Sequence, residues 1–115
     1  MIVSLAKIDC SRITDWPSFH DEFDRVFAFP DFYGRNMDAW NDCMTSIDTA
    51  DDGMTSIHCP PGGVLTIELE NVDELAGDRV EFLEAIVDGV AFVNFRRIDV
   101  GEQPVLALSY FRSHS

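Results

Sequence analysis

Three short apolar runs, separated by segments of helical periodicity, limit the folds open to this chain of 115 residues. The runs at residues 2–8, 64–69 and 105–111 are rich in β-branched and aliphatic side chains, which predicts three strands. Strands joined by helical crossovers pair in parallel with right-handed connections. The order strand, helix, helix, strand, helix, strand therefore predicts an α/β fold with a three-stranded parallel sheet.

The first predicted helix begins at Asp15, with Thr14 as its N-cap, and ends before Pro30. Its apolar residues recur at helical spacing and should form one buried face: Phe19, Phe23, Val26 and Phe27. The polar residues between them, including His20 and Glu22, are expected to face solvent.

Asn36 is expected to cap a second helix, and Asp78 a third that begins at Arg79. The predicted buried stripe of the second helix is Met37, Trp40, Met44 and Ile47. That of the third helix is Val80, Leu83, Ile86 and Val87, continued by Val90 and Val93. Gly89 should weaken the third helix. A short turn over residues 72–75 brings the expected number of helices to about four.

Residues 48–63 contain three aspartates, three glycines and a Pro-Pro pair, which predicts a loop. A loop of this length is unusual in a compact domain, so we expect a surface insertion or a mobile segment. Asp48, Asp51 and Asp52 offer oxygen ligands of the kind that bind Mg²⁺, but they lack EF-hand spacing. A solvated loop without a metal is the favoured interpretation.

The chain has 21 acidic residues against 8 basic ones and a formal net charge of −13. Such a field repels nucleic acid and anionic membranes and attracts basic surfaces. Acidity that serves only solubility is the alternative interpretation. Because of this charge, we expect no nucleic-acid partner. We also expect no membrane partner, since no apolar run approaches the roughly 20 residues of a membrane span.

The three cysteines, Cys10, Cys43 and Cys59, are far apart and form no CxxC pair. An odd number of cysteines without a secretory signal indicates reduced thiols and a cytoplasmic location. The histidines do not stand at zinc-ligand spacing with them. Cys43 is expected to be a structural, partly buried thiol and not a nucleophile, so no enzyme activity and no cofactor are predicted.

The segment 30–44, PDFYGRNMDAWNDCM, carries the candidate site. Asp38 and Asp42 stand four residues apart and should share one exposed helical face, away from the buried stripe. Two like charges at this spacing cost a few tenths of a kcal/mol in an isolated helix, which can mark a binding face. Alternatively, Asp38 only complements the helix dipole and Asp42 is an ordinary solvated residue.

Phe32, Tyr33 and Gly34 precede this helix, and the glycine permits a sharp approach of the backbone. Aromatic side chains beside paired carboxylates are typical of a protein–protein hot spot that meets a cationic cleft. The residue pattern therefore favours a protein-binding face over a catalytic pocket.

The same fifteen residues resemble the central motif of the barstar family, the intracellular inhibitors of barnase-like ribonucleases. The resemblance implies a single barstar-like domain over residues 1–115, with 48–63 as a probable insertion. It also implies a three-stranded parallel sheet packed by about four helices. One acidic helix and the loop before it would enter the active site of a basic microbial ribonuclease or a related nuclease toxin.

By position, Asp42 matches the principal hot-spot aspartate of the family, which takes the place of a substrate phosphate, and Asp38 matches the second binding aspartate. Phe32 matches a loop tyrosine that stacks on the enzyme, but it lacks the hydroxyl. Gly34 and Asn36 match loop residues that pack at the interface. The resemblance thus implies a partner-binding site at Asp42, Asp38, Phe32, Tyr33, Gly34, Asn36 and Asn41.

The chain departs from the family pattern at three positions. Arg35 stands where the family has an acidic residue, Asn41 where it has a tryptophan, and Arg97 near a further acidic contact. Reversed charges at a binding face change partner choice through repulsion as well as through lost attraction. An acidic interaction module of the antitoxin or immunity type, directed at a different basic nuclease or another basic protein, is therefore the alternative function.

Overall fold

A computed structural model describes residues 1–49 and 53–113 of the chain. The strands are β1 (Leu5–Asp9), β2 (Leu65–Glu70) and β3 (Leu106–Ser109). The α-helices are α1 (Trp16–Phe27), α2 (Met37–Thr45) and α3 (Val80–Asp99). Three short 3₁₀ helices complete the described elements: η1 (Cys10–Arg12), η3 (Val72–Leu75) and η4 (Gly77–Arg79). The predicted order of strands and helices is confirmed.

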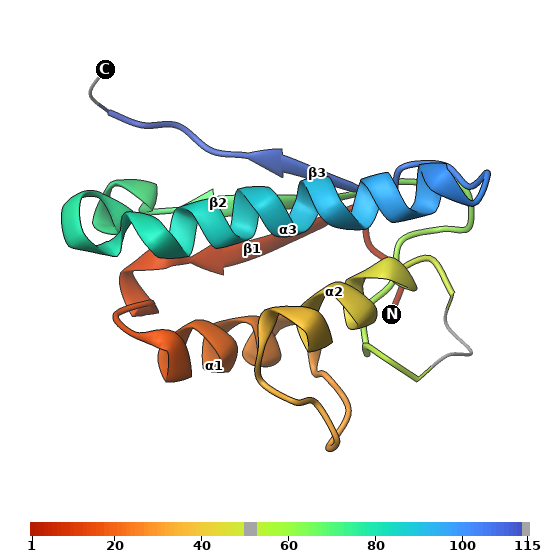
Figure 1. Cartoon of the computed structure of the whole chain (residues 1–115), viewed down its shortest axis with the longest axis horizontal. Helices are drawn as coiled ribbons and strands as arrows, with labels where there is room; N and C mark the ends of the chain where they lie inside the picture. Colours follow the sequence, from red (N-terminus) through yellow and green to blue (C-terminus); the bar gives the residue numbers. More distant parts are fainter. Residues whose placement is uncertain (50–52, 114–115) are drawn as a thin grey trace.

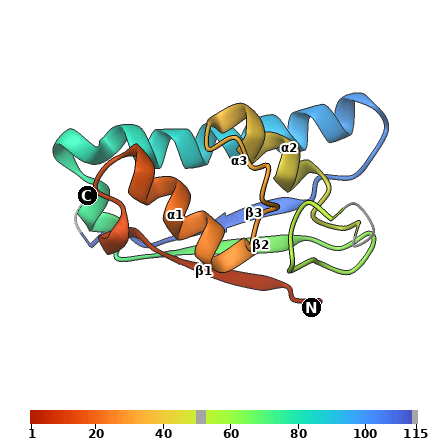
Figure 2. The same cartoon turned by 90° about the horizontal axis from the view of Figure 1, so that it is seen from below.

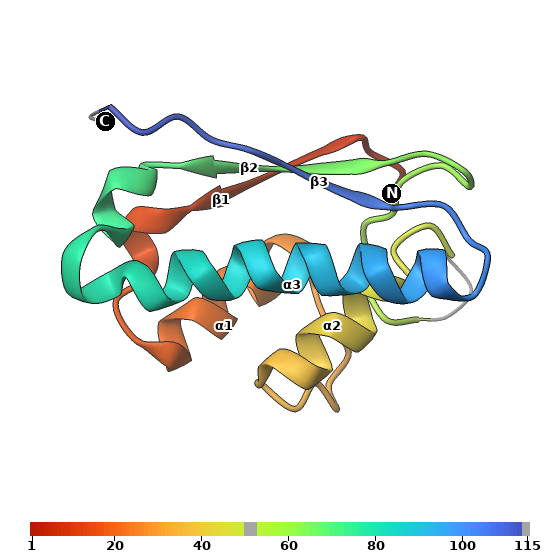
Figure 3. The same ribbon diagram turned by 45° about the horizontal axis from the view of Figure 1, so that its top comes forward.

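The three strands form one parallel sheet in the order β1-β2-β3, with Ala6 paired to Ile67 and Ile67 paired to Leu108. All three α-helices lie in a layer against one face of this sheet (Figure 1). The oblique view separates the sheet from the helical layer (Figure 3). The parallel α/β sheet is confirmed. The expectation of about four helices is not confirmed, because the turn over residues 72–75 is too short for an α-helix and forms a 3₁₀ turn.

The core lies between the sheet and the helices, where Ile8 and Ile67 are fully buried. Strand residues alternate between the two faces, so every second side chain of β2 points into this core. The phenylalanine face of α1 is confirmed, since Phe19, Phe23 and Phe27 have no exposed surface. The view of Figure 2 shows α1, α2 and α3 on the same side of the sheet.

The prediction for α1 was wrong at its start and on its polar side. Asp15, and not Thr14, is the N-cap: its carboxylate accepts from the backbone N–H of Ser18 at 2.9 Å, which completes a capping box. His20 and Glu22 are buried instead of solvated. They are buried because each has a partner from another part of the chain that satisfies its polar atoms.

The prediction for α3 was wrong in two respects. Arg79 and not Asp78 occupies the N-cap position, and Asp78 lies in η4. Val80 and Val87 are exposed, because the stripe that meets the core is offset around the helix. This buried stripe consists of Phe82, Leu83, Ile86, Gly89, Val90, Val93 and Arg97. Despite Gly89, the helix runs without interruption over 20 residues.

The predicted loop at 48–63 contains no helix or strand among its described residues, but part of it packs tightly. The backbone of His58 donates to the carbonyl of Met1 at 2.8 Å and accepts from Val3 at 2.7 Å. Thr55, His58 and Cys59 are buried. This stretch therefore extends the sheet past the start of β1, with an isolated parallel bridge between Ile2 and His58.

No helix among residues 1–49 and 53–113 has the length and apolar character needed to cross a bilayer.

Candidate functional site

The loop at residues 30–36 presents one aromatic ring outward and turns the other inward. Phe32 is 75% exposed. Tyr33 packs against Phe29, with ring centroids 4.4 Å apart, and its hydroxyl lies 2.5 Å from Nδ1 of His20. Burial raises the pKa of the Tyr33 phenol, so this hydroxyl stays protonated. The inward ring therefore anchors the loop on α1, and the outward ring faces solvent.

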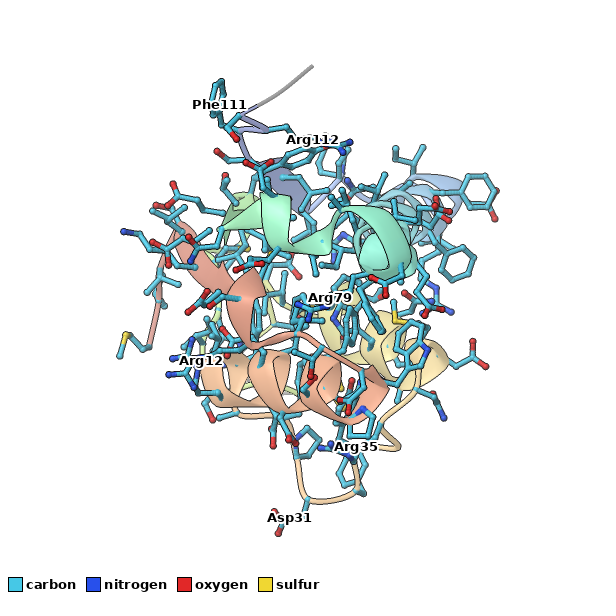
Figure 4. The ribbon with its side chains drawn as sticks, turned by 90° about the vertical axis from the view of Figure 1, so that its left-hand side faces the viewer. Arg12, Asp31, Arg35, Arg79, Phe111 and Arg112 are labelled. Atoms are coloured by element: carbon cyan, nitrogen blue, oxygen red, sulfur yellow. The ribbon has the colours of Figure 1, made fainter. Side chains whose placement is uncertain are left out.

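Arg35 ties the same loop to α1. Its guanidinium donates to Oδ1 of Asp21 at 2.8 Å and to the carbonyl of Pro17 at 2.9 Å. Figure 4 shows Arg35 beside α1 and Asp31 at the outer tip of the loop. Arg35 has a φ of 55°, so the left-handed residue of this turn is an arginine and not Gly34. A methyl group at Gly34 would make only ordinary contacts at 3.5 Å, so the close backbone approach expected there is absent.

Asn36 caps α2 as predicted, since its side-chain oxygen accepts from the backbone N–H of Ala39 at 2.8 Å. Asp38 and Asp42 follow on the helix one turn apart, and both are exposed. The N-terminal position of Asp38 complements the helix dipole. The two carboxylates thus lie where the spacing predicts, beyond the buried stripe of Trp40 and Met44.

Asp42 is not free, because Arg96 of α3 reaches across to it. Nη1 of Arg96 lies 2.9 Å from Oδ1 of Asp42 and 3.2 Å from the hydroxyl of Thr45. The carbon of the guanidinium stands 4.9 Å from the ring centroid of Phe92. No local sequence pattern indicates this contact, since 54 residues separate Arg96 from Asp42.

A shallow hollow of about 280 Å³ joins the loop to α2. It is lined by Phe32, Tyr33, Gly34, Ala39, Asp42, Cys43 and Met54. Four of the seven predicted partner-binding residues therefore meet in one depression. Met54 brings the predicted loop 48–63 to the edge of the site, which no local pattern indicated.

A second hollow, also of about 280 Å³, lies on the other side of the loop. Trp16, His20, Arg35, Asn36 and Met37 line it. Asn36 therefore borders a different depression from Asp42, and its side-chain oxygen is engaged in the helix cap.

Asn41 is half-buried and points less toward solvent than the two aspartates. Its side-chain oxygen and the indole N–H of Trp40 are buried without a hydrogen-bond partner in the described part of the chain. The backbone carbonyl of Asn41 accepts from the hydroxyl of Thr45 at 2.6 Å. Trp40 belongs to the core, as predicted, and has no exposed surface.

Arg97 does not face a partner. It is 7% exposed and forms a two-pronged ion pair with Asp48 at 3.1 and 2.9 Å. It also donates to the carbonyls of Thr45 and Gln103. Arg97 thus joins the ends of α2 and α3, and the reversed charge expected there on the binding face is an internal structural contact instead.

Among the described residues, Cys43 and Asp48, two candidates for catalysis or metal binding, are buried or paired with another side chain. Burial, with a further contribution from Asp42, raises the pKa of the Cys43 thiol to about 11, which keeps it in its unreactive protonated form. Asp48 is paired with Arg97, and Asp51 and Asp52 lie outside the described residues, as does His114. The described residues contain no group of three metal-ligating side chains.

Comparison with known protein families matches residues 3–98 to the family described as barstar (barnase inhibitor). The matched segment begins just before β1 and ends near the end of α3, so it includes the loop and helix that build the candidate site. No curated protein matches the chain.

Proposed function

The chain belongs to the barstar family, and on that premise we propose that it inhibits a basic microbial ribonuclease by covering the enzyme's active site. One observation carries the proposal. The exposed ring of Phe32 and the carboxylate of Asp42 line the same hollow between the 30–36 loop and α2. An aromatic contact and an anion are thereby offered together on a single face, as a partner with a cationic cleft requires.

The net charge of −13 supports the approach of such an enzyme. An acidic field raises the rate at which a cationic protein meets this surface, and salt screens it over about 8–10 Å. Asp42 and Asp38 then act as counter-charges in place of substrate phosphate. The loop seals the rim, with Phe32 on the enzyme surface and Tyr33 holding the loop in place from within.

Inhibition of this kind needs no nucleophile, base or cofactor from the chain, because occlusion alone stops the enzyme. The rigid supports of the site fit this role. Asn36 fixes the start of α2, and Arg35 and Tyr33 fix the loop against α1. Preorganised contacts reduce the entropy that is lost when the partner binds.

A second candidate is an antitoxin or immunity-type module for a different basic nuclease. The presence of two arginines around an otherwise acidic face, Arg35 and Arg96, favours a partner with a charge pattern of its own. We therefore keep the target class broader than barnase-like enzymes.

The test is inhibition of a purified barnase-type ribonuclease by the protein at low and moderate salt. Asp42→Asn should weaken inhibition by at least about thirtyfold, because losing one member of a desolvated charge pair costs about 2–5 kcal/mol. Asp78→Asn removes the same charge from an exposed position in η4 and should change inhibition by no more than about twofold. If Asp42→Asn and Asp78→Asn weaken inhibition equally, Asp42 contributes only through the net charge of the protein.

A further inference from the structure

Arg96 is held in the candidate site by more than its ion pair with Asp42. Its guanidinium also contacts the hydroxyl of Thr45, 3.2 Å away, and the ring of Phe92, 4.9 Å away. An exposed ion pair by itself rarely fixes a long side chain, since its Coulomb energy is small in water. The two additional contacts come from different elements, α2 and α3, and position the cation whether or not Asp42 is engaged.

The hydroxyl of Thr45 is oriented to accept from Arg96. Its hydrogen is donated to the carbonyl of Asn41 at 2.6 Å, so its lone pairs are left for Nη1 of Arg96. Phe92 offers the negative face of its ring to the same guanidinium. Arg96 therefore lies in a prepared place and is still 37% exposed toward a partner.

This placement puts a positive charge from α3 beside the acidic face of α2. Asp38 and Asp42 are negative, and Arg96 stands next to Asp42 with its positive charge. A ligand that brings only positive charge to Asp42 must displace Arg96 or lie against it. When water is excluded from a docked interface, an unpaired charge of this kind is costly.

We propose that Arg96 is a specificity-determining residue of the docking face. A protein binds well at Asp42 only when it brings an acidic group for Arg96 together with a basic group for Asp42. The proposal deepens the proposed function and rests on it for the identity of the partner. It defines the target as a ribonuclease whose cationic cleft carries a carboxylate at the position that faces the C-terminal half of α3. Phe92 and Phe95, which are 43% and 62% exposed, border Arg96 on that helix and offer apolar contact around it.

The charge selectivity is testable on the whole protein without any nuclease. Two peptides serve as probes in NMR titrations followed at the amides of α2: hexa-arginine, and a six-residue peptide of alternating arginine and glutamate. The variants are Arg96→Gln and the matched control Arg79→Gln, which loses the same charge at the N-terminal end of α3. Thermal unfolding of each variant shows that it is folded.

Relative to Arg79→Gln, Arg96→Gln should bind hexa-arginine about two- to fivefold more tightly, the range of an exposed ion pair. The alternating peptide should bind Arg96→Gln no more tightly, or less tightly, than it binds the control. If both variants gain the same affinity for hexa-arginine relative to the wild type, the proposal is overturned, because net charge would then explain the effect. An equal gain in the affinity of Arg96→Gln for both peptides would also overturn the proposal, because Arg96 would then not recognise the acidic groups of the alternating peptide.

A ribonuclease inhibition assay with the same variants tests this proposal separately from the proposed function. If the wild-type protein inhibits a barnase-type enzyme, Arg96→Gln should inhibit it less well, and tighter inhibition would overturn the role of Arg96. If neither protein inhibits the enzyme, the proposed target class is wrong, whereas the peptide titrations still decide whether Arg96 selects by charge.

Discussion

A Cβ atom built on Gly89 would lie 2.8 Å from Cζ3 of Trp40, so α3 and α2 meet at a point that has no room for a side chain. The indole of Trp40 is fully buried and cannot move into solvent. This close approach sets α2 on α3, and with it the position of Asp42 relative to Arg96.

Gly89→Ala should therefore destabilise the protein by up to about 2 kcal/mol, measured by denaturant unfolding. The gain in helix propensity is about 1 kcal/mol, and the overpacking of a filled core costs about 1–3 kcal/mol. Gly34→Ala is the control, because a methyl group there meets only ordinary contacts. A Gly89→Ala variant that is more stable than the wild type would show that the two helices separate easily.

Glu22 is a buried carboxylate that joins α1 to the end of β1. It accepts from the backbone N–H of Asp9 at 2.8 Å and from the guanidinium of Arg25 at 2.8 and 2.6 Å. Glu22→Gln should lower the free energy of unfolding by about 1–3 kcal/mol, since one acceptor is replaced by a donor that faces Arg25. The same change at exposed Glu84 should have almost no effect in the same unfolding experiment.

Asn36 caps α2, and this role can be separated from contact with a partner. Asn36→Ala should cost about 0.5–2 kcal/mol in denaturant unfolding, because the N–H of Ala39 loses its acceptor. Asn36→Asp keeps the acceptor and should keep the stability. If Asn36→Asp is as stable as the wild type but inhibits a ribonuclease less well, the side chain contacts the partner directly.

His20 makes stability depend on pH. Desolvation, followed by the positive charge of Arg35, lowers its pKa below the usual 6.5, and Asp21 only partly opposes this. The unfolded chain therefore binds a proton more readily than the folded protein does. Stability is fully present above about pH 6.5 and falls as the pH drops through the lowered folded value.

Unfolding free energies at pH 7.5 and 5.5 measure this dependence, with His20→Gln as the comparison. The variant should lose less stability than the wild type over this interval, because it lacks the titrating ring. The same loss in both proteins would assign the dependence to other groups.

Local sequence patterns predict the parts of this molecule that depend on nearest neighbours along the chain. The spacing of Phe19, Phe23 and Phe27 predicts a buried helical face, and the Asn36 cap fixes the start of α2. The four-residue spacing of Asp38 and Asp42 places both on one exposed face. The parallel order of the strands follows from the helical crossovers between them.

The contacts that the patterns do not predict join residues far apart in the sequence. Nothing near Arg96 indicates Asp42, because the packing of α3 on α2 brings them together. The sequence predicts that His20 is solvated, because no local pattern shows that the loop places Tyr33 over it. The sequence predicts only that Gly89 weakens α3, whereas in the structure Gly89 is the point at which Trp40 of α2 approaches the helix.

Inhibition by occlusion requires this protein to occupy the active site of a basic ribonuclease. The most direct measurement is the dissociation constant for a barnase-type enzyme with and without a saturating mononucleotide in the enzyme's active site. We expect the two ligands to compete, so that the apparent dissociation constant rises in proportion to the nucleotide concentration. A constant that does not change with nucleotide, or the absence of a complex, would contradict the claim.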